Sequence, residues 1–221
     1  MGDLRDKLDH KEGPDVLRGR NAHRQVVRRP RGFTLVELMV TITLAAILLA
    51  VAMPMLTTWT RNVKVRAVAD ALQNGLRQAQ NEALRRSRQM VFSLTNSADP
   101  STSLTAVANG SNWSINIAKS AMDSGSVYVE SGILSDVNSN VEITGPAAVC
   151  FNSVGRLVAN SATDISGADC DLPTTTPPVT VYDIKMTDAD RPLRVLVTLG
   201  GQVRMCDPAK TLSTSNPDGC P

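Results

Sequence analysis

The chain has 221 residues, of which 42% are hydrophobic and only 3% aromatic, so any core must be mainly aliphatic. Its two histidines, His10 and His23, both precede Gly32, and the rest of the chain therefore cannot form a histidine-based catalytic triad or dyad, or a histidine-bound zinc site. No GxxxxGK[ST] loop, GxGxxG loop or CxxC pair occurs, and the carboxylates are scattered. We therefore expect no enzyme, no cofactor and no metal.

The charge of the chain is unevenly distributed. The residues before Gly32 include nine Lys or Arg and five Asp or Glu, a net charge of +4, whereas the residues from Phe33 onward include fourteen and sixteen, a net charge of −2. Positive charge before an apolar segment holds that end of a chain on the cytoplasmic side of a membrane. Residues 1–32, which lack an apolar period, are predicted to be a cytoplasmic leader without regular structure.

A nearly uninterrupted apolar run follows, from Phe33 to Leu56, with Glu37 as its only charge. As a helix it would be about 36 Å long, which is enough to cross a bilayer core. Three interpretations compete: a transmembrane anchor, a secretory signal cut after the A-x-A sequence at Ala50–Ala52, and a prepilin signal. The run is longer than a usual secretory signal and has a carboxylate near its start.

The residues around Gly32 favour the third interpretation. The sequence of residues 31–38, RGFTLVEL, resembles the RGFTLxEL motif of type IV prepilins. The resemblance implies cleavage between Gly32 and Phe33, N-methylation of Phe33, and pairing of Glu37 with the new amino terminus of the same or a neighbouring subunit. Because a carboxylate in a membrane helix costs roughly 2.5–3.5 kcal/mol on insertion scales, we expect Glu37 to have such a partner. The alternative is a tolerated charge that snorkels to the headgroups.

The helix is predicted to continue beyond the apolar run. Pro54 removes one helical hydrogen bond and should kink the helix. From residue 57 to 89 apolar residues recur every three or four positions, which indicates an amphipathic helix with one apolar stripe. The stripe consists of Val65, Val68, Ala69, Leu72, Leu76, Ala79 and Ala83.

Residues 90–221 are rich in Ser, Thr, Asn, Val and Ile, and short alternating runs separated by turn residues predict β-strands. We expect an α+β fold, in which the long N-terminal helix packs on an antiparallel β-rich head with two sheets. Gly200-Gly201 predicts a tight primed turn in a hairpin. The expected strands are 90–94, 113–117, 126–130, 141–144, 149–152, 179–186, 193–199 and 202–206, and residues 96–112 and 160–178 are expected to be loops.

All four cysteines follow the apolar run. Four reduced cysteines in a cytosolic protein are the alternative to two disulfides in an exported head. Sequence alone allows three pairings. We favour Cys150–Cys170 and Cys206–Cys220, because both close short loops and the second would hold the apolar-poor last fifteen residues.

Two segments of the head narrow the resemblance. Residues 200–208, GGQVRMCDP, are similar to the C-terminal signature of FimT proteins, and residues 151–157, FNSVGRL, resemble an internal F-x-x-x-G-R segment of the GspH/FimT family. Some FimT proteins bind DNA through a G-R-x-R tail. Here Gln202 replaces the first arginine and only Arg204 remains.

The candidate DNA-binding residues are therefore Arg204 and Gln202, with Arg194 and Lys210 as nearby sources of charge. Gln202 can hydrogen-bond a phosphate but releases no counterion. The alternative is that Arg204 pairs with Asp207 or another local acid.

The resemblance implies a minor type IV pilin of the FimT kind that aids pilus biogenesis. The alternatives are a GspH-type pseudopilin of a type II secretion system, a DNA-binding pilin for DNA uptake, and an exported soluble protein. The implied partners are other pilins or pseudopilins, prepilin peptidase, the inner membrane, an assembly platform, an assembly ATPase, and DNA. The implied location is the bacterial inner membrane, in a single pass with a cytoplasmic N-terminus and a periplasmic head, and then a filament.

Overall fold

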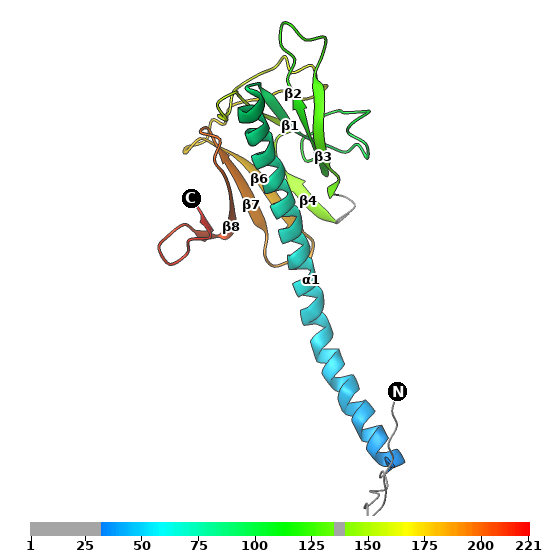
Figure 1. Cartoon of the computed structure of the whole chain (residues 1–221). Coiled ribbons are helices and arrows are strands. Elements are labelled where there is room, and N and C mark those ends of the chain that lie inside the picture. The colour runs from blue at the N-terminus through cyan, green and yellow to red at the C-terminus, as the bar shows by residue number, and fades with distance from the viewer. Residues whose placement is uncertain (1–31, 135–139) are drawn as a thin grey trace, which may run out of the picture. The chain divides into compact units, whose positions relative to one another are not determined.

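The computed structural model of the chain describes residues 32–134 and 140–221. All of the expected leader except Gly32 lies outside the described residues. By its internal contacts the chain divides into two units, Met1–Ala45 and Ala46–Pro221. The second unit contains both β-sheets and the part of the long helix that packs on them (Figure 1).

The helix α1 runs from Leu35 to Arg86. Thr34 caps its start, since the Thr34 hydroxyl accepts the backbone N–H of Glu37 at 3.2 Å. The helix ends at Ser87, whose φ of 52° is left-handed, and the amide of Arg88 bonds the carbonyl of Ala83 at 3.3 Å. The predicted end near residue 89 is wrong by three residues, because a serine rather than a glycine takes the left-handed position.

Two sheets form the head. The first has the order β3-β2-β1-β5 and the second has the order β4-β6-β7-β8-β9. All neighbouring strands are antiparallel except β8 and β9, which are parallel. The strands are β1 (Met90–Thr95), β2 (Asn112–Ile117), β3 (Val127–Gly132), β4 (Val141–Thr144), β5 (Ala148–Phe151), β6 (Val179–Met186), β7 (Leu193–Thr198), β8 (Val203–Thr211) and β9 (Gly219–Cys220). The expected α+β class and the two sheets are confirmed.

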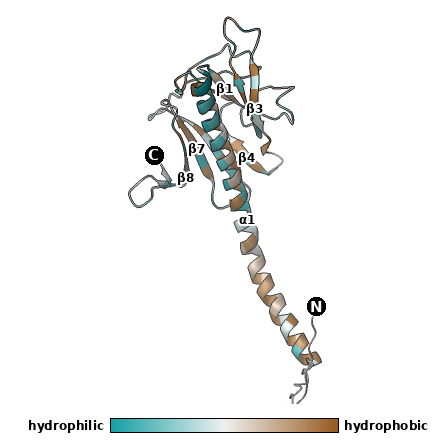
Figure 2. Cartoon of the chain, in the orientation of Figure 1, coloured by the Kyte–Doolittle hydropathy of each residue, from teal (hydrophilic) through white to brown (hydrophobic). Residues whose placement is uncertain are grey.

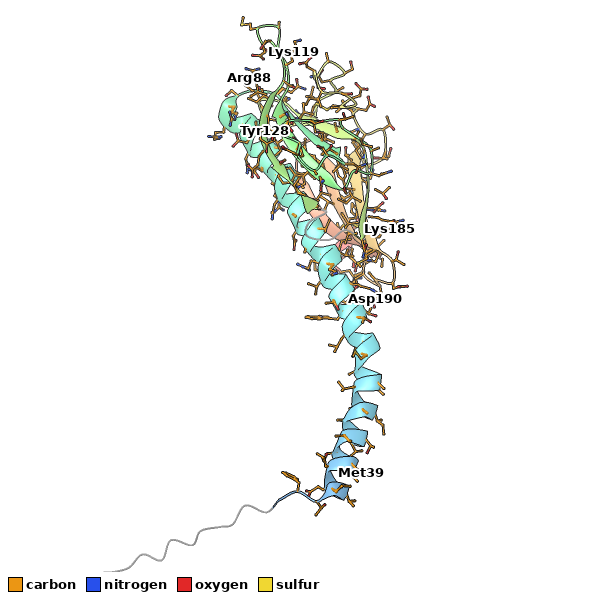
Figure 3. The ribbon with its side chains drawn as sticks, turned by 90° about the vertical axis from the view of Figure 1, so that its right-hand side faces the viewer. Met39, Arg88, Lys119, Tyr128, Lys185 and Asp190 are labelled. Atoms are coloured by element: carbon orange, nitrogen blue, oxygen red, sulfur yellow. A yellow bond between two sulfur atoms is a disulfide. The ribbon has the colours of Figure 1, made fainter. Side chains whose placement is uncertain are left out.

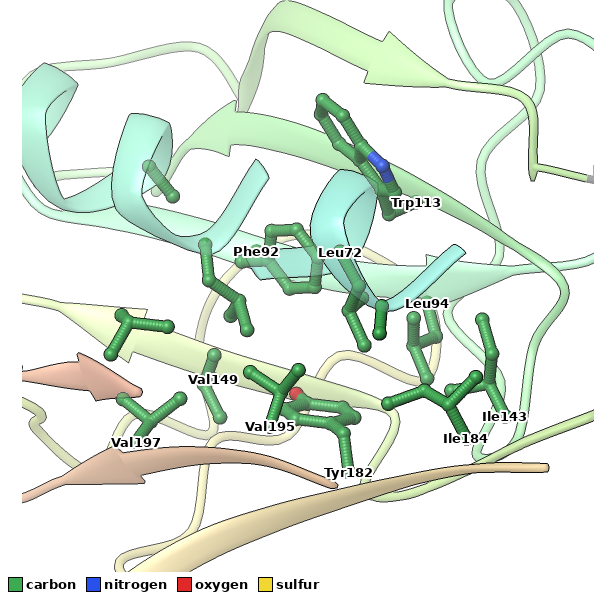
Figure 4. Packing of buried hydrophobic residues seen from close by; sticks show 14 of the residues in the cluster. Leu72, Phe92, Leu94, Trp113, Ile143, Val149, Tyr182, Ile184, Val195 and Val197 are labelled. Atoms are coloured by element: carbon green, nitrogen blue, oxygen red, sulfur yellow. The ribbon is translucent and has the colours of Figure 1, made fainter. Parts of the chain in front are cut away.

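The main core lies between α1 and the inner faces of the two sheets. Every residue of the predicted apolar stripe of α1 is at most 1% exposed. Figure 4 shows Leu72 of this stripe near Phe92 of the first sheet and Tyr182 of the second. The rings of Phe92 and Trp113 stack at 5.7 Å, and a Cβ on Gly75 would lie 2.8 Å from the Trp113 ring, so the helix approaches this ring closely because position 75 has no side chain.

The turn between β7 and β8 is not the tight primed turn expected from Gly200-Gly201. The carbonyl of Thr198 accepts the amide of Gly201 at 2.8 Å, and the amide of Thr198 donates to Gln202 at 3.0 Å, so three residues form the loop. Within it Gly201 has a positive φ of 88°, whereas Gly200 does not. A primed turn needs positive φ at its first central residue, and this loop instead has its left-handed glycine last.

Candidate functional site

The residues of the expected processing site lie at the exposed start of α1. The side chain of Phe33 is 82% exposed, and a Cβ added to Gly32 would meet no atom within 4 Å. Glu37 belongs to the first turn of the helix, where a carboxylate is stabilised by the helix dipole. Thr34 and Glu37 have the T-x-x-E spacing of a capping box, a signature that is visible in the sequence but was not among our predictions. Gly32, Phe33 and Glu37 are therefore close together in the chain and accessible.

The described residues leave the apolar run that follows uncovered. Its large side chains are exposed from Phe33, at 82%, to Leu56, at 58%. An 18-residue window of α1 has a mean hydropathy of 2.5, and its length and composition suffice to cross a membrane. Figure 2 shows the first part of α1 predominantly brown, the colour of apolar residues. Together with the motif at its start, this surface indicates a membrane anchor. The helix continues through Pro54, and the kink there stays a prediction.

The structure pairs the cysteines as Cys150–Cys170 and Cys206–Cys220. The first disulfide lies among small apolar side chains under the loops that cover the outer face of the first sheet. The second connects β8 to β9 and packs on Leu196 of β7. It therefore fixes the last residues of the chain to the second sheet. The strand that they form, β9, was not predicted from the sequence because it has only two residues.

The candidate DNA-binding residues do not form one open basic surface. Arg194 makes two hydrogen bonds to the Asp183 carboxylate on the neighbouring strand, at 2.6 and 3.2 Å. Lys210 lies between two carboxylates, 2.5 Å from Asp218 and 3.5 Å from Asp207. The hydrogen bond from Lys210 lowers the pKa of the Asp218 carboxyl below its ordinary value and raises the pKa of Lys210.

Arg204 serves the C-terminal tail. Its guanidinium donates to the backbone carbonyls of Pro217, at 2.7 Å, and Gly219, at 3.3 Å. The alternative that Arg204 pairs with Asp207 or another local acid is therefore wrong, because its N–H groups donate to backbone carbonyls and not to a carboxylate. Gln202 is exposed on the preceding turn, where its backbone N–H donates to the Thr198 hydroxyl.

The two head segments that resemble the family, residues 151–157 and 200–208, meet on α1. Gln80 donates from its side-chain amide to the carbonyl of Gly155 at 2.9 Å. A Cβ on Gly201 would lie 1.9 Å from that same carbonyl oxygen, and both glycines have positive φ. The turn of the first segment, the β7–β8 loop and the helix are therefore joined at one point (the glycine junction, formed by Gln80, Gly155 and Gly201). Both segments are visible in the sequence, but their contact is not predicted by it.

Among residues 32–134 and 140–221 there is no group of three or more His, Cys, Asp or Glu side chains that could hold a metal ion. In the same residues all cysteines are in disulfides.

The basic end of α1 is also locally paired, because Glu82 accepts bonds from Arg85 at 2.7 Å and Arg86 at 2.6 Å, and Arg88 bonds Asp123. The hydrogen bonds from Arg85, the larger cause, and from Arg86 lower the pKa of Glu82 below its ordinary value.

Two family profiles match the chain, one at the start of α1 and one over most of the head. A profile of the prokaryotic N-terminal methylation motif matches residues 27–53, and a profile of the type II transport protein GspH matches residues 68–201. The chain belongs to the GspH family. No curated protein matches this GspH-family chain. Two crystal structures of the Pseudomonas aeruginosa PAO1 type IV minor pilin FimU are similar to it. One has 14% identity and a TM-score of 0.45 over 68% of this chain and 96% of FimU, and the other has 13% and 0.42 over 65% and 96%.

Proposed function

We propose that this GspH-family chain is a FimT-like minor type IV pilin. In this proposal residues 1–32 are a leader that prepilin peptidase removes by cutting between Gly32 and Phe33, and Phe33 is then N-methylated. Residues 33–56 anchor the chain in the inner membrane and later enter the filament, residues 57–89 continue into the head, and residues 90–221 form the periplasmic head. The subunit has a structural role in pilus biogenesis and is not an enzyme.

One observation carries the proposal: an exposed apolar surface begins immediately after the processing motif. An apolar surface of this length is stable only inside a bilayer or against other apolar helices. Glu37, one turn after Phe33, is its only charge, and the amine created by cleavage would neutralise it. Burial in a membrane and then in a filament therefore explains the apolar surface, and processing at Gly32 explains the single carboxylate in it.

The test is the intact mass of the protein purified from membranes, measured without reduction and again after reduction and alkylation. The expected mass starts at methylated Phe33, and four thiols become accessible only after reduction. A mass that starts at Met53, in soluble extract, would show cleavage after Ala52 and contradict the filament proposal.

A GspH-type pseudopilin of a type II secretion filament is the second candidate, and the GspH profile match supports it. Both systems use the same N-terminal processing, so the mass cannot separate them. Deleting the gene and measuring pilus formation and protein secretion side by side does separate them. Loss of pili with normal secretion is expected for the minor pilin, and the opposite result for the pseudopilin.

DNA uptake is a third candidate, and the local pairing of Arg194, Arg204 and Lys210 speaks against it. The variant Arg204→Lys decides whether Arg204 binds phosphate or only holds the C-terminal tail. If Arg204 binds phosphate, Arg204→Lys keeps most of the DNA affinity that Arg204→Ala loses at low salt. If Arg204 serves only the tail, neither variant changes DNA affinity, and both loosen residues 217–219.

A further inference from the structure

A groove of about 620 Å³ lies beside α1 in the second unit. Met55, Trp59 and Val63 line its helical wall, and because they are four positions apart they share one face of α1. They are 78%, 64% and 48% exposed. The facing wall includes Leu193 of β7 and Met205 of β8. The groove therefore has apolar walls that the described residues leave partly uncovered.

The groove begins where the apolar run ends. Met55 belongs to the run and also lines the groove, and Trp59 follows Leu56 by three residues. The uncharged part of the run, residues 38–56, is about 28 Å long as a helix, close to the ~30 Å thickness of a bilayer core. The headgroup layer adds roughly 5–7 Å on each side of the core. Trp59, about 4.5 Å beyond Leu56, therefore lies in this layer, where tryptophan is enriched in membrane proteins.

Two charged residues at the rim of the groove, Asp190 and Arg191, have no ion pair among residues 32–134 and 140–221. Asn62 holds both of them, since its side-chain oxygen accepts the two backbone N–H groups at 3.2 Å and its NH₂ group donates to the Asp190 carboxylate at 2.5 Å. Figure 3 shows Asp190 beside the helix. Asn62 lies about 9 Å beyond Leu56, so these two charges lie at the outer boundary of the headgroup layer.

The charges of the groove balance. Three basic and three acidic residues line it, so its net charge is zero. Four of these six are already engaged, because Lys210 pairs with Asp207 and Asp218, and Arg66 pairs with Asp70 on the helix. What remains is one carboxylate next to one guanidinium. A purely anionic or purely cationic ligand would serve only one of them, whereas a ligand with both charges close together serves both.

We propose that this groove binds a phospholipid of the periplasmic leaflet whose headgroup carries both a phosphate and an ammonium, as phosphatidylethanolamine does. Arg191 donates to the phosphate, which a guanidinium can bind through two parallel N–H groups. The Asp190 carboxylate accepts an N–H of the ammonium, and Met55 and Trp59 cover the glycerol and the first acyl carbons. The inference rests on the membrane anchor of the proposed function. A lipid held in this way joins the base of the head to the membrane surface.

Photo-crosslinking tests the site in the full-length chain, reconstituted in vesicles of phosphatidylethanolamine and phosphatidylglycerol. The photoreactive residue benzoylphenylalanine replaces either Val63 in the groove or Thr60, which is exposed and does not line it. Thr60 is three residues nearer to the membrane, so lipids that merely surround the helix would react more at position 60 than at position 63. We expect the opposite, with most of the lipid adduct at position 63 by mass spectrometry. Vesicles of phosphatidylglycerol alone should give roughly tenfold less adduct there, the effect of about 1.4 kcal/mol.

Charge variants test the two headgroup contacts separately. Asp190→Asn should lower the adduct at position 63 roughly tenfold in the mixed vesicles and leave it unchanged in phosphatidylglycerol alone. Arg191→Gln should lower it in both kinds of vesicle, and Arg191→Lys should restore most of it. The matched controls are Glu142→Gln and Lys185→Gln, which break an exposed ion pair elsewhere on the second sheet and should change nothing.

Three results would each overturn the inference: as much adduct at position 60 as at position 63, equal adduct in the two kinds of vesicle, or equal effects of Asp190→Asn and Glu142→Gln. Failure of the proposed function looks different. A chain that is not anchored in the membrane would give lipid adducts at neither position, and its mature form would not start at Phe33.

Discussion

Substitution of Gly201 by alanine should strongly destabilise the head, because two penalties coincide at the glycine junction. A residue with a Cβ at a φ of 88° meets a conformational penalty of about 1–2 kcal/mol. The new Cβ would also lie 1.9 Å from the carbonyl oxygen of Gly155, a backbone atom that Gln80 holds by a hydrogen bond. Overpacking of this kind costs about 1–3 kcal/mol. Together they predict a loss of about 2–5 kcal/mol in the free energy of unfolding.

Gly200 provides the matched control one position earlier. Its nearest neighbour to an added Cβ is the Thr198 hydroxyl at 3.7 Å, and its φ is not left-handed. Both substitutions change the unfolded chain in the same way, by restricting one glycine, so that contribution cancels when Gly201→Ala is compared with Gly200→Ala. The remaining difference reports the strain at the junction.

The assay is urea unfolding of the oxidised full-length protein in detergent, followed by the fluorescence of Trp113, which is 7% exposed, after Trp59, which is 64% exposed, has been replaced by Phe in every variant. We expect Gly200→Ala to unfold within about 1 kcal/mol of the parent chain and Gly201→Ala at a clearly lower urea concentration. Equal unfolding free energies for the two variants would refute the close approach of the β7–β8 loop to Gly155.

Three further predictions concern the tail and the contact between helix and head. Replacing Cys206 and Cys220 with alanine should lower the free energy of unfolding by about 3 kcal/mol, the loop-closure value for a separation of 14 residues, and a change under 1 kcal/mol in urea would contradict this. Lys210 lowers the pKa of Asp218. The Lys210–Asp218 pair therefore stabilises the fold above the ordinary aspartate pKa, and this stabilisation is lost as the pH falls through the lowered pKa. An NMR titration should show a higher Asp218 pKa in Lys210→Met. Asn62→Ala removes bonds to the amides of residues 190 and 191, both 3.2 Å, and should speed hydrogen exchange of those two amides while exchange in the β1–β2 pair stays unchanged.

The sequence was sufficient for the elements whose signals are local. Seven of the eight expected strands form within two residues of their predicted ends, because alternation of apolar and polar residues directly encodes which face is buried. The stripe on α1 was found for the same reason, at the helical period. β8 extends five residues past its predicted end at Cys206, through Pro208. A proline is tolerated there because this part of β8 has only the two-residue β9 beyond it.

The elements that were missed depend on contacts between distant segments. β9 has only two residues and is a strand because the Cys206–Cys220 disulfide and Arg204 hold it beside β8. Ser87 ends α1 in a conformation that serines seldom adopt, so no residue preference predicted it. The glycine junction requires two turns some 45 residues apart to meet, and spacing in sequence carries no information about that meeting.

The structure gives Arg204 a role that its sequence motif does not predict. As a sequence feature it suggested phosphate binding, because Arg204 stands at the second arginine of the G-R-x-R tail of some FimT proteins, although Gln202 replaces the first. In the structure its N–H groups are directed to the carbonyls of Pro217 and Gly219, and these carbonyls belong to a segment with little apolar content of its own. Such a segment gains too little from burial to offset its chain entropy, so it needs hydrogen bonds and a disulfide to stay ordered. The tail therefore explains Arg204 without a ligand.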